Sequence, residues 1–339
     1  EEWLLPPFLG EMGVEIEFFL ASVEPYLRSG WKIPARRPQL YPRGTAFYDE
    51  ELFAKIDTLI KQYQAKAIVS RLMLPFPALG PINLSIENSE WKVELRINKE
   101  QQQAIIKIRE FEKELKKIVG ERILTPTRPI TLWDDFLTTV HNPYNDPFGL
   151  SSLYALKPSY LPPDYSEGPD IYVDHIGVQL RRYREPNRNS DVAYVLKRAQ
   201  EASMLLGKPI LIYGHPNGTV HPEGYPTTLE LSQKRTEPLL TTELKALRTC
   251  AIMFAPNSGW ADLMAWLNVP TFVEKVECKN QFYRLRTYKT RMAELRADMS
   301  MEELVIDLFS ARERLPDDSH CQEPFQWYQM PGAANPYFR

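Results

Sequence analysis

The chain has 339 residues, 43% of them hydrophobic and 25% charged, which is the ordinary composition of a soluble globular protein. This length predicts two domains of similar size rather than one core. The net charge of -3 offers no basic footprint for nucleic acid, and no run is long enough for a membrane span or a signal peptide, so we expect neither nucleic-acid nor membrane partners.

The three cysteines, Cys250, Cys278 and Cys321, are widely spaced and odd in number. They indicate reduced thiols rather than a disulfide framework or a zinc site, and we expect a cytoplasmic location. The chain begins at Glu1 instead of a methionine, and we expect it to be part of a larger multidomain protein.

The first half alternates predicted helices and strands. A helical pattern begins near Val14 and ends at Gly30, where a C-terminal cap belongs. Hydrophobic periodicity predicts further helices at 50–63 and 101–119 and strands at 66–72, 91–97 and 122–124. Residues 141–168 are rich in proline and tyrosine, and they are the best candidate for an interdomain connection.

The second half alternates more regularly. Strands are predicted at 171–180, at 209–213, at 251–255 and from Pro270 onward, and helices at 191–206, at 240–248, after Gly259 and at 301–312. This alternation predicts a parallel sheet with helices on both faces. We expect an α/β fold of two Rossmann-like domains, 1–160 and 161–310, facing each other across a cleft, with a tail, 311–339, that packs back on the first domain.

The segment 250–275 is the most informative part of the chain. A buried strand runs into a turn at Asn257, Ser258 and Gly259, and an amphipathic helix follows. Free backbone N–H groups and the helix dipole make such a turn favourable for phosphate. The alternative is that any strand–helix unit needs a turn of this kind.

Two arginines, Arg181 and Arg182, end the first predicted strand of the second half. A guanidinium at that edge suits a bidentate contact with a diphosphate. Because neighbouring residues of a strand point to opposite faces, we expect only one of the two to reach a ligand. The alternative is a solvated basic loop.

A third signal is the loop rich in Gly, Pro and His from 211 to 226. Tyr213 or His215 could contact a nucleotide base at the end of the preceding strand. The spacing of His215, His221 and Glu223 lacks the regularity of a metal site, and we expect no bound metal.

The fourth signal is LGEMGVEIE, 9–17. Gly10 and Gly13 allow a close backbone approach, and Glu11 in the loop suits a general base that faces the cleft. Glu15, which we place beside this cleft, and Glu17 also suit the first turn of a helix, where a carboxylate complements the dipole.

Several motifs are absent from the sequence. It contains no P-loop, no G-x-G-x-x-G after a strand, no G-x-S-x-G elbow and no D-x-D pair. These absences argue against a P-loop NTPase, a standard dinucleotide dehydrogenase, an α/β-hydrolase and a metal-dependent sugar transferase.

The segment 255–272 resembles the donor site of GT-B glycosyltransferases, particularly bacterial heptosyltransferases. The matching residues are Asn257, Ser258, Gly259, Leu263 and Pro270. Asp262 stands where that family usually has histidine, and we place Asp262 in the donor site. The N-terminal LGE is similar to that family's LGD, whose carboxylate is the proposed base, and the resemblance implies this role for Glu11.

The stretch IGVQLRR, 176–182, resembles the His-Ile/Val-Arg-Arg motif of the fucosyltransferase superfamily, which also has a GT-B fold. There the arginine binds the donor diphosphate, and Arg181 or Arg182 would match it. Gln179 stands in place of the usual histidine.

Together the resemblances imply a metal-independent, inverting glycosyltransferase that needs no cofactor and serves glycan or polysaccharide assembly. The second domain would bind a nucleotide-sugar, with GDP- or ADP-linked donors favoured, and the first a glycan or other hydroxyl acceptor. The transferred group would be a hexosyl, deoxyhexosyl or heptosyl unit. Two alternatives stay open: a nucleotide-sugar epimerase of the same fold, and a non-catalytic module that binds nucleotides or sugars.

Overall fold

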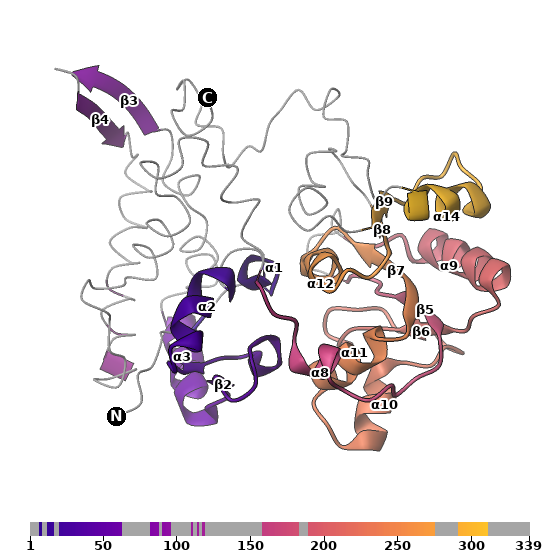
Figure 1. The fold of residues 1–339 in the computed structure, drawn as a ribbon, viewed down its shortest axis with the longest axis horizontal. Helices are drawn as coiled ribbons and strands as arrows, with labels where there is room; N and C mark the ends of the chain where they lie inside the picture. The colour runs from indigo at the N-terminus through magenta and orange to yellow at the C-terminus, as the bar shows by residue number, and fades with distance from the viewer. Residues whose placement is uncertain are drawn as a thin grey trace. The chain divides into compact units, whose positions relative to one another are not determined.

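The computed structural model in Figure 1 describes residues 7–8, 12–16, 20–62, 82–87, 90–95, 110, 114, 117–118, 158–182, 189–274 and 291–310. The chain divides into two compact units: the first takes in Glu1–Pro38 and Gly44–Pro158, and the second Gln39–Arg43 and Ser159–His320. The expected domain bounds at 160 and 310 stay predictions, and the expected tail, 311–339, lies outside the described residues.

The described residues of the first unit form helices and two small sheets. Its described elements are α1 (Met12–Val14), α2 (Leu20–Arg28), β1 (Ile33–Pro34), β2 (Ala46–Phe47), α3 (Glu50–Gln62), β3 (Ile82–Glu87) and β4 (Glu90–Leu95). The 3-10 turn η2 (Pro38–Leu40) begins in the first unit and ends in the segment Gln39–Arg43 of the second. β1 and β2 pair in parallel, and β3 and β4 form an antiparallel pair. α3 confirms the predicted helix at 50–63, whereas the predicted strands at 66–72 and 122–124 lie outside the described residues.

The second unit is built on a five-stranded parallel sheet. Its strands are β5 (His175–Val178), β6 (Ile210–Ile212), β7 (Cys250–Pro256), β8 (Thr271–Glu274) and β9 (Met292–Glu294), in the order β6-β5-β7-β8-β9. Its described helices are α8 (Pro163–Ser166), α9 (Val192–Leu206), α10 (Thr228–Arg235), α11 (Leu239–Leu247), α12 (Gly259–Leu267) and α14 (Met301–Ser310). The expected α/β class and the Rossmann-like layout of this half are confirmed.

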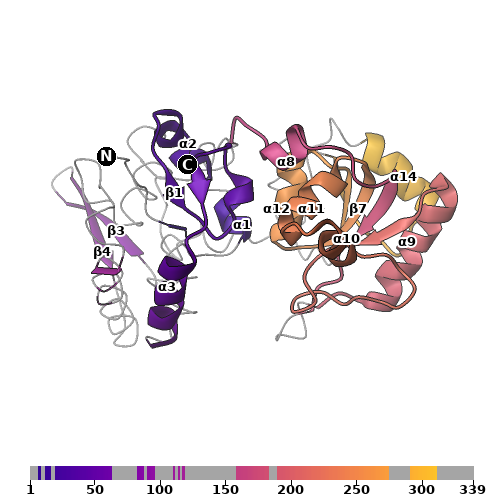
Figure 2. The ribbon, with the colours of Figure 1, turned by 90° about the horizontal axis from the view of Figure 1, so that it is seen from below.

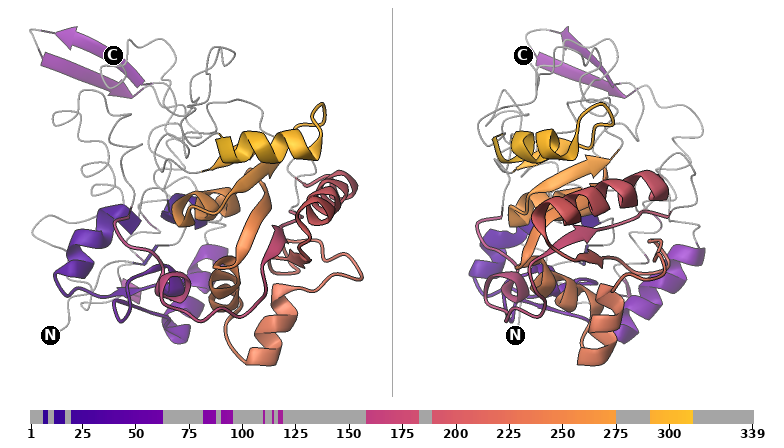
Figure 3. Two further views of the ribbon diagram at one scale, coloured as in Figure 1. Left: turned by 45° about the vertical axis from the view of Figure 1, so that its right-hand side comes forward. Right: turned by 90° about the vertical axis from the view of Figure 1, so that its right-hand side faces the viewer.

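Helices cover both faces of this sheet, and the alternation of strand side chains decides which face each residue joins. Figure 2 shows α11 and α12 on one side of β7 and α9 and α14 on the other, and the right view of Figure 3 shows α9 and α14 against the same side of the strands. The core on the α9 side holds every second residue of three central strands, among them Ile176, Val178, Ile252, Phe254 and Phe272. Residues of opposite parity, such as Val273, join Ala261 and Ala265 of α12.

Local capping explains where the helices of this unit begin and end. The side chain of Asp191 accepts the Tyr194 N–H at the start of α9, and Gly207 ends the helix with a φ of 64°. α10 begins with a reciprocal capping box between Thr227 and Glu230. Neither α10 nor β9 was predicted from the sequence, although the Thr-x-x-Glu signal of the capping box is present in it.

Part of the expected interdomain connection packs on the second unit instead. Trp266 donates its ring N–H to the carbonyl of Tyr160 at 3.1 Å, and the Tyr165 hydroxyl donates to the carbonyl of Leu267 at 3.1 Å. Arg248 adds an ion pair with Asp170 at 2.9 Å. These contacts to α12 and to the end of α11 are consistent with 159–168 being part of the second unit, so only the residues before it are left as a candidate connection.

Within the described ranges, no helix combines the length and apolar character needed to cross a bilayer.

Candidate functional site

The strand order of the second unit identifies one place in the sheet where the direction of the chain connections reverses. From β5 the chain passes to β6 on one side and then returns to β7 on the other. The carboxyl ends of β5 and β7 therefore flank the topological switch point, outside which ligands bind in open parallel sheets. We call Gln179–Arg181 and Asn257–Gly259, which follow these two strands, the switch-point edge.

The register of the sheet shows how the switch-point edge is assembled. Val178 pairs with Phe254, and the Gln179 N–H donates to the Phe254 carbonyl at 2.9 Å. The pairing of β5 with β7 ends there, and beyond it the backbone of Arg181 is hydrogen-bonded to Ser190 instead. Leu180 belongs to the core beneath α9, so the alternate residues Gln179 and Arg181 share the face of α12. Arg182 has the opposite parity, and the role of either arginine in donor binding stays a prediction.

The first turn of α12 differs from those of its neighbours. Ser258 caps it with a neutral hydroxyl, which accepts the Trp260 N–H at 3.3 Å, while the Ser258 carbonyl accepts the Ala261 N–H at 2.8 Å. In the part of the chain that the structure describes, no group accepts from the N–H of Ser258 or Gly259. The start of α9 is capped by the carboxylate of Asp191, and the capping box of α10 includes Glu230. The cap of α12 is neutral, although its first turn also contains Asp262.

The loop after β6 is tied to the extension of β5. Thr219 forms an antiparallel bridge with Arg181, and the Val220 N–H donates to the Leu180 carbonyl at 2.8 Å. The amide of Gln179 donates to the Thr219 hydroxyl at 2.9 Å. His215, which we expected to contact a base, is exposed on this loop and belongs to the same edge of the sheet.

Gly214 is the residue that lets this loop leave β6. Its φ is +105°, and a Cβ there would lie 2.1 Å from the hydroxyl oxygen of Thr219. The Gly214 N–H donates to Glu243 at 2.8 Å, and its carbonyl accepts from the ring of His221 at 2.9 Å. A side chain at this position would push Thr219 away from Gln179.

Gln179, in the switch-point edge, was not selected as a site residue from the sequence. Its side chain is 4% exposed, and its oxygen is buried without a hydrogen-bond partner among the described residues. A buried polar atom left unpaired costs about 1–3 kcal/mol, and natural proteins keep few of them. The only signal in the sequence was its place in the arginine motif, where the resembling family has histidine.

Tyr213 does not offer a surface to a ligand. Its side chain is fully buried, its hydroxyl donates to the ring nitrogen of His175 at 2.7 Å, and its ring stacks on that imidazole at 5.9 Å. Trp260 packs edge-on against it at 5.8 Å. We therefore correct the expectation for Tyr213: it belongs to the core between the sheet and α12, and the base contact is left to His215.

Glu243 on α11 is a buried acid that also went unselected. One carboxylate oxygen accepts both the Gly214 N–H and the Thr228 hydroxyl, the latter at 3.2 Å. Burial raises the pKa of Glu243 from 4.5 to about 7. An acid that titrates near neutrality beside a loop is frequent at functional sites, but an isolated glutamate in a helical pattern gives no signal of it.

The remaining candidates lie in different surroundings. Gly10 and Glu11 are outside the described residues, and Gly13 lies in α1. Glu15 is 1% exposed, with an oxygen 2.7 Å from the guanidinium of Arg37, so it belongs to a buried ion pair rather than to a surface that faces a ligand. Asp262 is buried in the first turn of α12, and its role in donor binding stays a prediction.

No protein-family model matches the chain, and no curated protein matches it. Among solved structures, it aligns with Escherichia coli heptosyltransferase WaaC bound to ADP-2-deoxy-2-fluoro heptose, at 9% identity over 81% of this chain and 89% of that chain, with a TM-score of 0.39. The same enzyme with ADP aligns at 9% identity over 91% and 99% of the two chains, with a TM-score of 0.40. A family 9 glycosyl transferase from Veillonella parvula aligns at 14% identity over 92% and 89%, with a TM-score of 0.36.

Proposed function

We propose that this chain is a glycosyltransferase of the GT-B class that moves a sugar from a nucleotide-sugar to an acceptor hydroxyl. The observation that carries the proposal is the switch-point edge, where Arg181 and the anion-receptive first turn of α12 follow neighbouring strands on one face of the sheet. The motif resemblances at 176–182 and 255–272 make the anion the diphosphate of a sugar donor.

In this proposal the second unit supplies the donor site. Arg181 and the N–H groups of Ser258 and Gly259 bind the diphosphate, and they stabilise the negative charge that grows on it as the sugar–phosphate bond breaks. These groups take the place of a metal ion. His215, exposed on the loop after β6, contacts the nucleoside.

The first domain holds the acceptor in this proposal. Glu11 removes the proton of the acceptor hydroxyl as its oxygen attacks the anomeric carbon, in one displacement that inverts the configuration. The donor is GDP- or ADP-linked, and the product belongs to glycan or polysaccharide assembly.

The experiment that tests the donor site compares two neighbouring arginines. ADP, GDP, UDP and CMP are titrated calorimetrically into wild-type protein, Arg181→Ala and Arg182→Ala. We expect ADP or GDP to bind, Arg181→Ala to weaken binding roughly 10-fold or more through loss of a charge-assisted contact, and Arg182→Ala to change it by less than about 3-fold. Absence of nucleotide binding, or equal effects of the two substitutions, would overturn the donor site.

A second experiment tests the chemistry. Glu11→Gln should abolish sugar transfer while leaving the nucleotide Kd within about 2-fold of wild type, because the base acts on the acceptor and not on the donor. Conversion of a nucleotide-sugar to its epimer without any acceptor would instead identify an epimerase. Nucleotide binding without any turnover would identify a binding module.

A further inference from the structure

Glu274, the last residue of β8, is a buried carboxylate outside the proposed donor contacts. Its side chain is 5% exposed, and one of its oxygens accepts the backbone N–H of Asp191 at 2.6 Å. A buried carboxylate is costly unless hydrogen bonds compensate it, so this contact fixes Asp191 firmly. Asp191 is the cap of α9, and Glu274 therefore sets where that helix begins.

Ser190, next to Asp191, holds the backbone of Arg181 from both sides. The Arg181 N–H donates to the Ser190 hydroxyl at 2.9 Å, and the Ser190 N–H donates to the Arg181 carbonyl at 3.0 Å. Both backbone polar groups of Arg181, the residue proposed to bind the diphosphate, are thus hydrogen-bonded to one serine. The bridge to Thr219 flanks the same residue from the loop after β6.

These contacts connect strands on both sides of β7. Glu274 ends β8, Arg181 extends β5, and β7, which leads into Asn257, lies between the two strands. Hydrogen bonds join Glu274 to Asp191 and Ser190 to Arg181, and a peptide bond joins Ser190 to Asp191. A change at Glu274 can therefore reach Arg181 without touching a ligand.

We propose that Ser190 and Glu274 are positioning residues that fix Arg181 to meet the donor diphosphate. The inference rests on the proposed function, because it needs Arg181 to be a nucleotide ligand. An arginine on a fixed backbone loses less conformational freedom when it binds, so freeing that backbone weakens binding without removing the guanidinium.

The experiment measures the Kd of ADP and GDP together with the free energy of unfolding in urea. Ser190→Ala should weaken nucleotide binding roughly 5-fold, and Glu274→Ala by a similar factor, since each removes about one net hydrogen bond from the series. Glu274→Gln keeps an oxygen for the Asp191 N–H and should restore affinity to within about 2-fold of wild type. Should Ser190→Ala fail to fold, the pair of substitutions at Glu274 carries the test.

A matched control separates positioning from loss of fold stability. Ser300 caps α14 at the same edge of the sheet, and its hydroxyl accepts the Glu303 N–H at 3.2 Å. Ser300→Ala should lower stability as Ser190→Ala does, yet leave the nucleotide Kd unchanged. In an Arg181→Ala background, Ser190→Ala should cause no further loss of affinity. A purely structural role of Ser190 would instead weaken binding in both backgrounds.

The outcomes distinguish the two proposals. If Arg181→Ala weakens binding while Ser190→Ala and Glu274→Ala do not, the donor site stands and the positioning role is wrong. If Arg181→Ala itself has no effect, the proposed donor contact fails and the positioning role falls with it.

Discussion

Gly177, in the middle of β5, lies beneath the ring of Tyr213, which packs with His175 and Trp260 in an aromatic cluster. The Tyr213 ring reaches across this position to His175, which lies two residues earlier in the strand. His175 donates from Nδ1 to the Val173 carbonyl at 2.8 Å, so its Nε2 is the acceptor for the Tyr213 hydroxyl. The cluster therefore depends on the absence of a side chain at residue 177.

Gly177→Ala should lower the free energy of unfolding by about 1–3 kcal/mol, the usual cost of overpacking a core. A Cβ there would lie 2.6 Å from the sulfur of Met253, 2.9 Å from that of Cys250 and 3.1 Å from the Tyr213 ring. Urea unfolding measures the loss. The control is Gly218→Ala, where a Cβ meets nothing within 4 Å and the change should stay within about 0.5 kcal/mol. Equal effects would contradict the steric argument.

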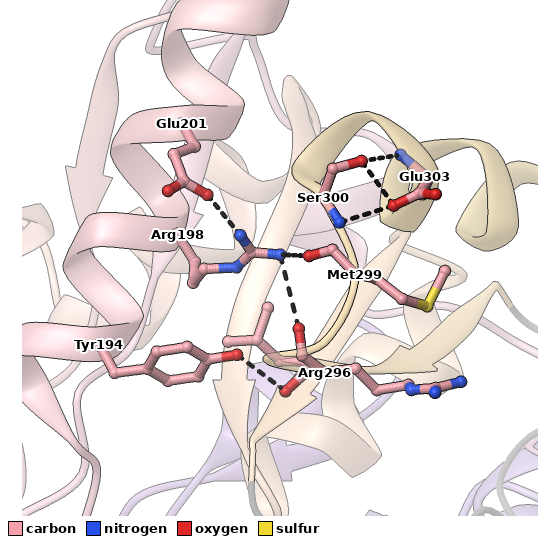
Figure 4. Close-up of polar contacts among 8 residues, drawn as sticks. Tyr194, Arg198, Glu201, Arg296, Met299, Ser300 and Glu303 are labelled. Atoms are coloured by element: carbon pink, nitrogen blue, oxygen red, sulfur yellow. Dashed lines mark hydrogen bonds and ion pairs between the residues drawn. The ribbon is translucent and has the colours of Figure 1, made fainter.

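At the scale of elements, α9 and its cap contact both β8 and the segment between β9 and α14. Its start is fixed by Glu274, and its middle holds the loop between β9 and α14 (Figure 4). Arg198 donates to the Met299 carbonyl at 2.7 Å and pairs with Glu201 at 2.5 Å, and the Tyr194 hydroxyl donates to the Leu295 carbonyl at 3.2 Å. These contacts attach β9 and α14 to the rest of the sheet.

Arg198→Met should reduce stability by about 1–3 kcal/mol, because the Met299 carbonyl loses its donor while the apolar volume is largely kept. Urea unfolding of the full chain gives the value. Glu201→Gln is the matched control: it removes the charge of a partly exposed partner and should cost less than about 1 kcal/mol. A larger loss from Glu201→Gln than from Arg198→Met would show that the ion pair, not the carbonyl contact, attaches the loop.

At the scale of the whole molecule, two buried groups oppose each other in the response to pH. Burial lowers the pKa of His175 from 6.5 to about 4. As pH falls, this histidine is protonated in the unfolded chain before it is protonated in the folded one. The stability that it contributes is therefore lost as pH falls from 6.5 to 4. Burial raises the pKa of Glu243 from 4.5 to about 7, so stability from that group is complete below pH 4.5 and is lost as pH rises to 7. Between pH 4.5 and 6.5 the two effects nearly cancel.

Glu243→Gln should remove the contribution of Glu243 to the pH dependence of stability and leave that of His175. The amide keeps an oxygen for the Gly214 N–H but cannot ionise, so the variant should gain on wild type as pH rises from 5 to 8, by about 3 kcal/mol in total. Urea unfolding of both proteins at several pH values measures the difference. Two parallel curves would show that Glu243 does not titrate in the folded protein near neutrality.

Local signals made much of the second unit predictable. Asp191 and Ser258 cap their helices as the sequence indicates, and the apolar run of β7 is a buried strand. Strand ends were overestimated, as for β5, because an extended apolar stretch looks the same whether or not a neighbour pairs with it. The predictions at Gly10 and Glu11 lie outside the described residues and stay predictions.

What the sequence by itself determined is most of the helices and strands of the second unit, and that Arg181 and the turn at Asn257 each follow a strand, because these depend on residues close together in the chain. Only the tertiary structure decided that Arg181 and not Arg182 shares the face of α12, and that Tyr213 is core. It alone brought Gln179 to Thr219 and Glu274 to Asp191. The physical reason is that sheet order, register and burial arise from pairing between distant segments, and a side chain's role follows from the neighbours it acquires there.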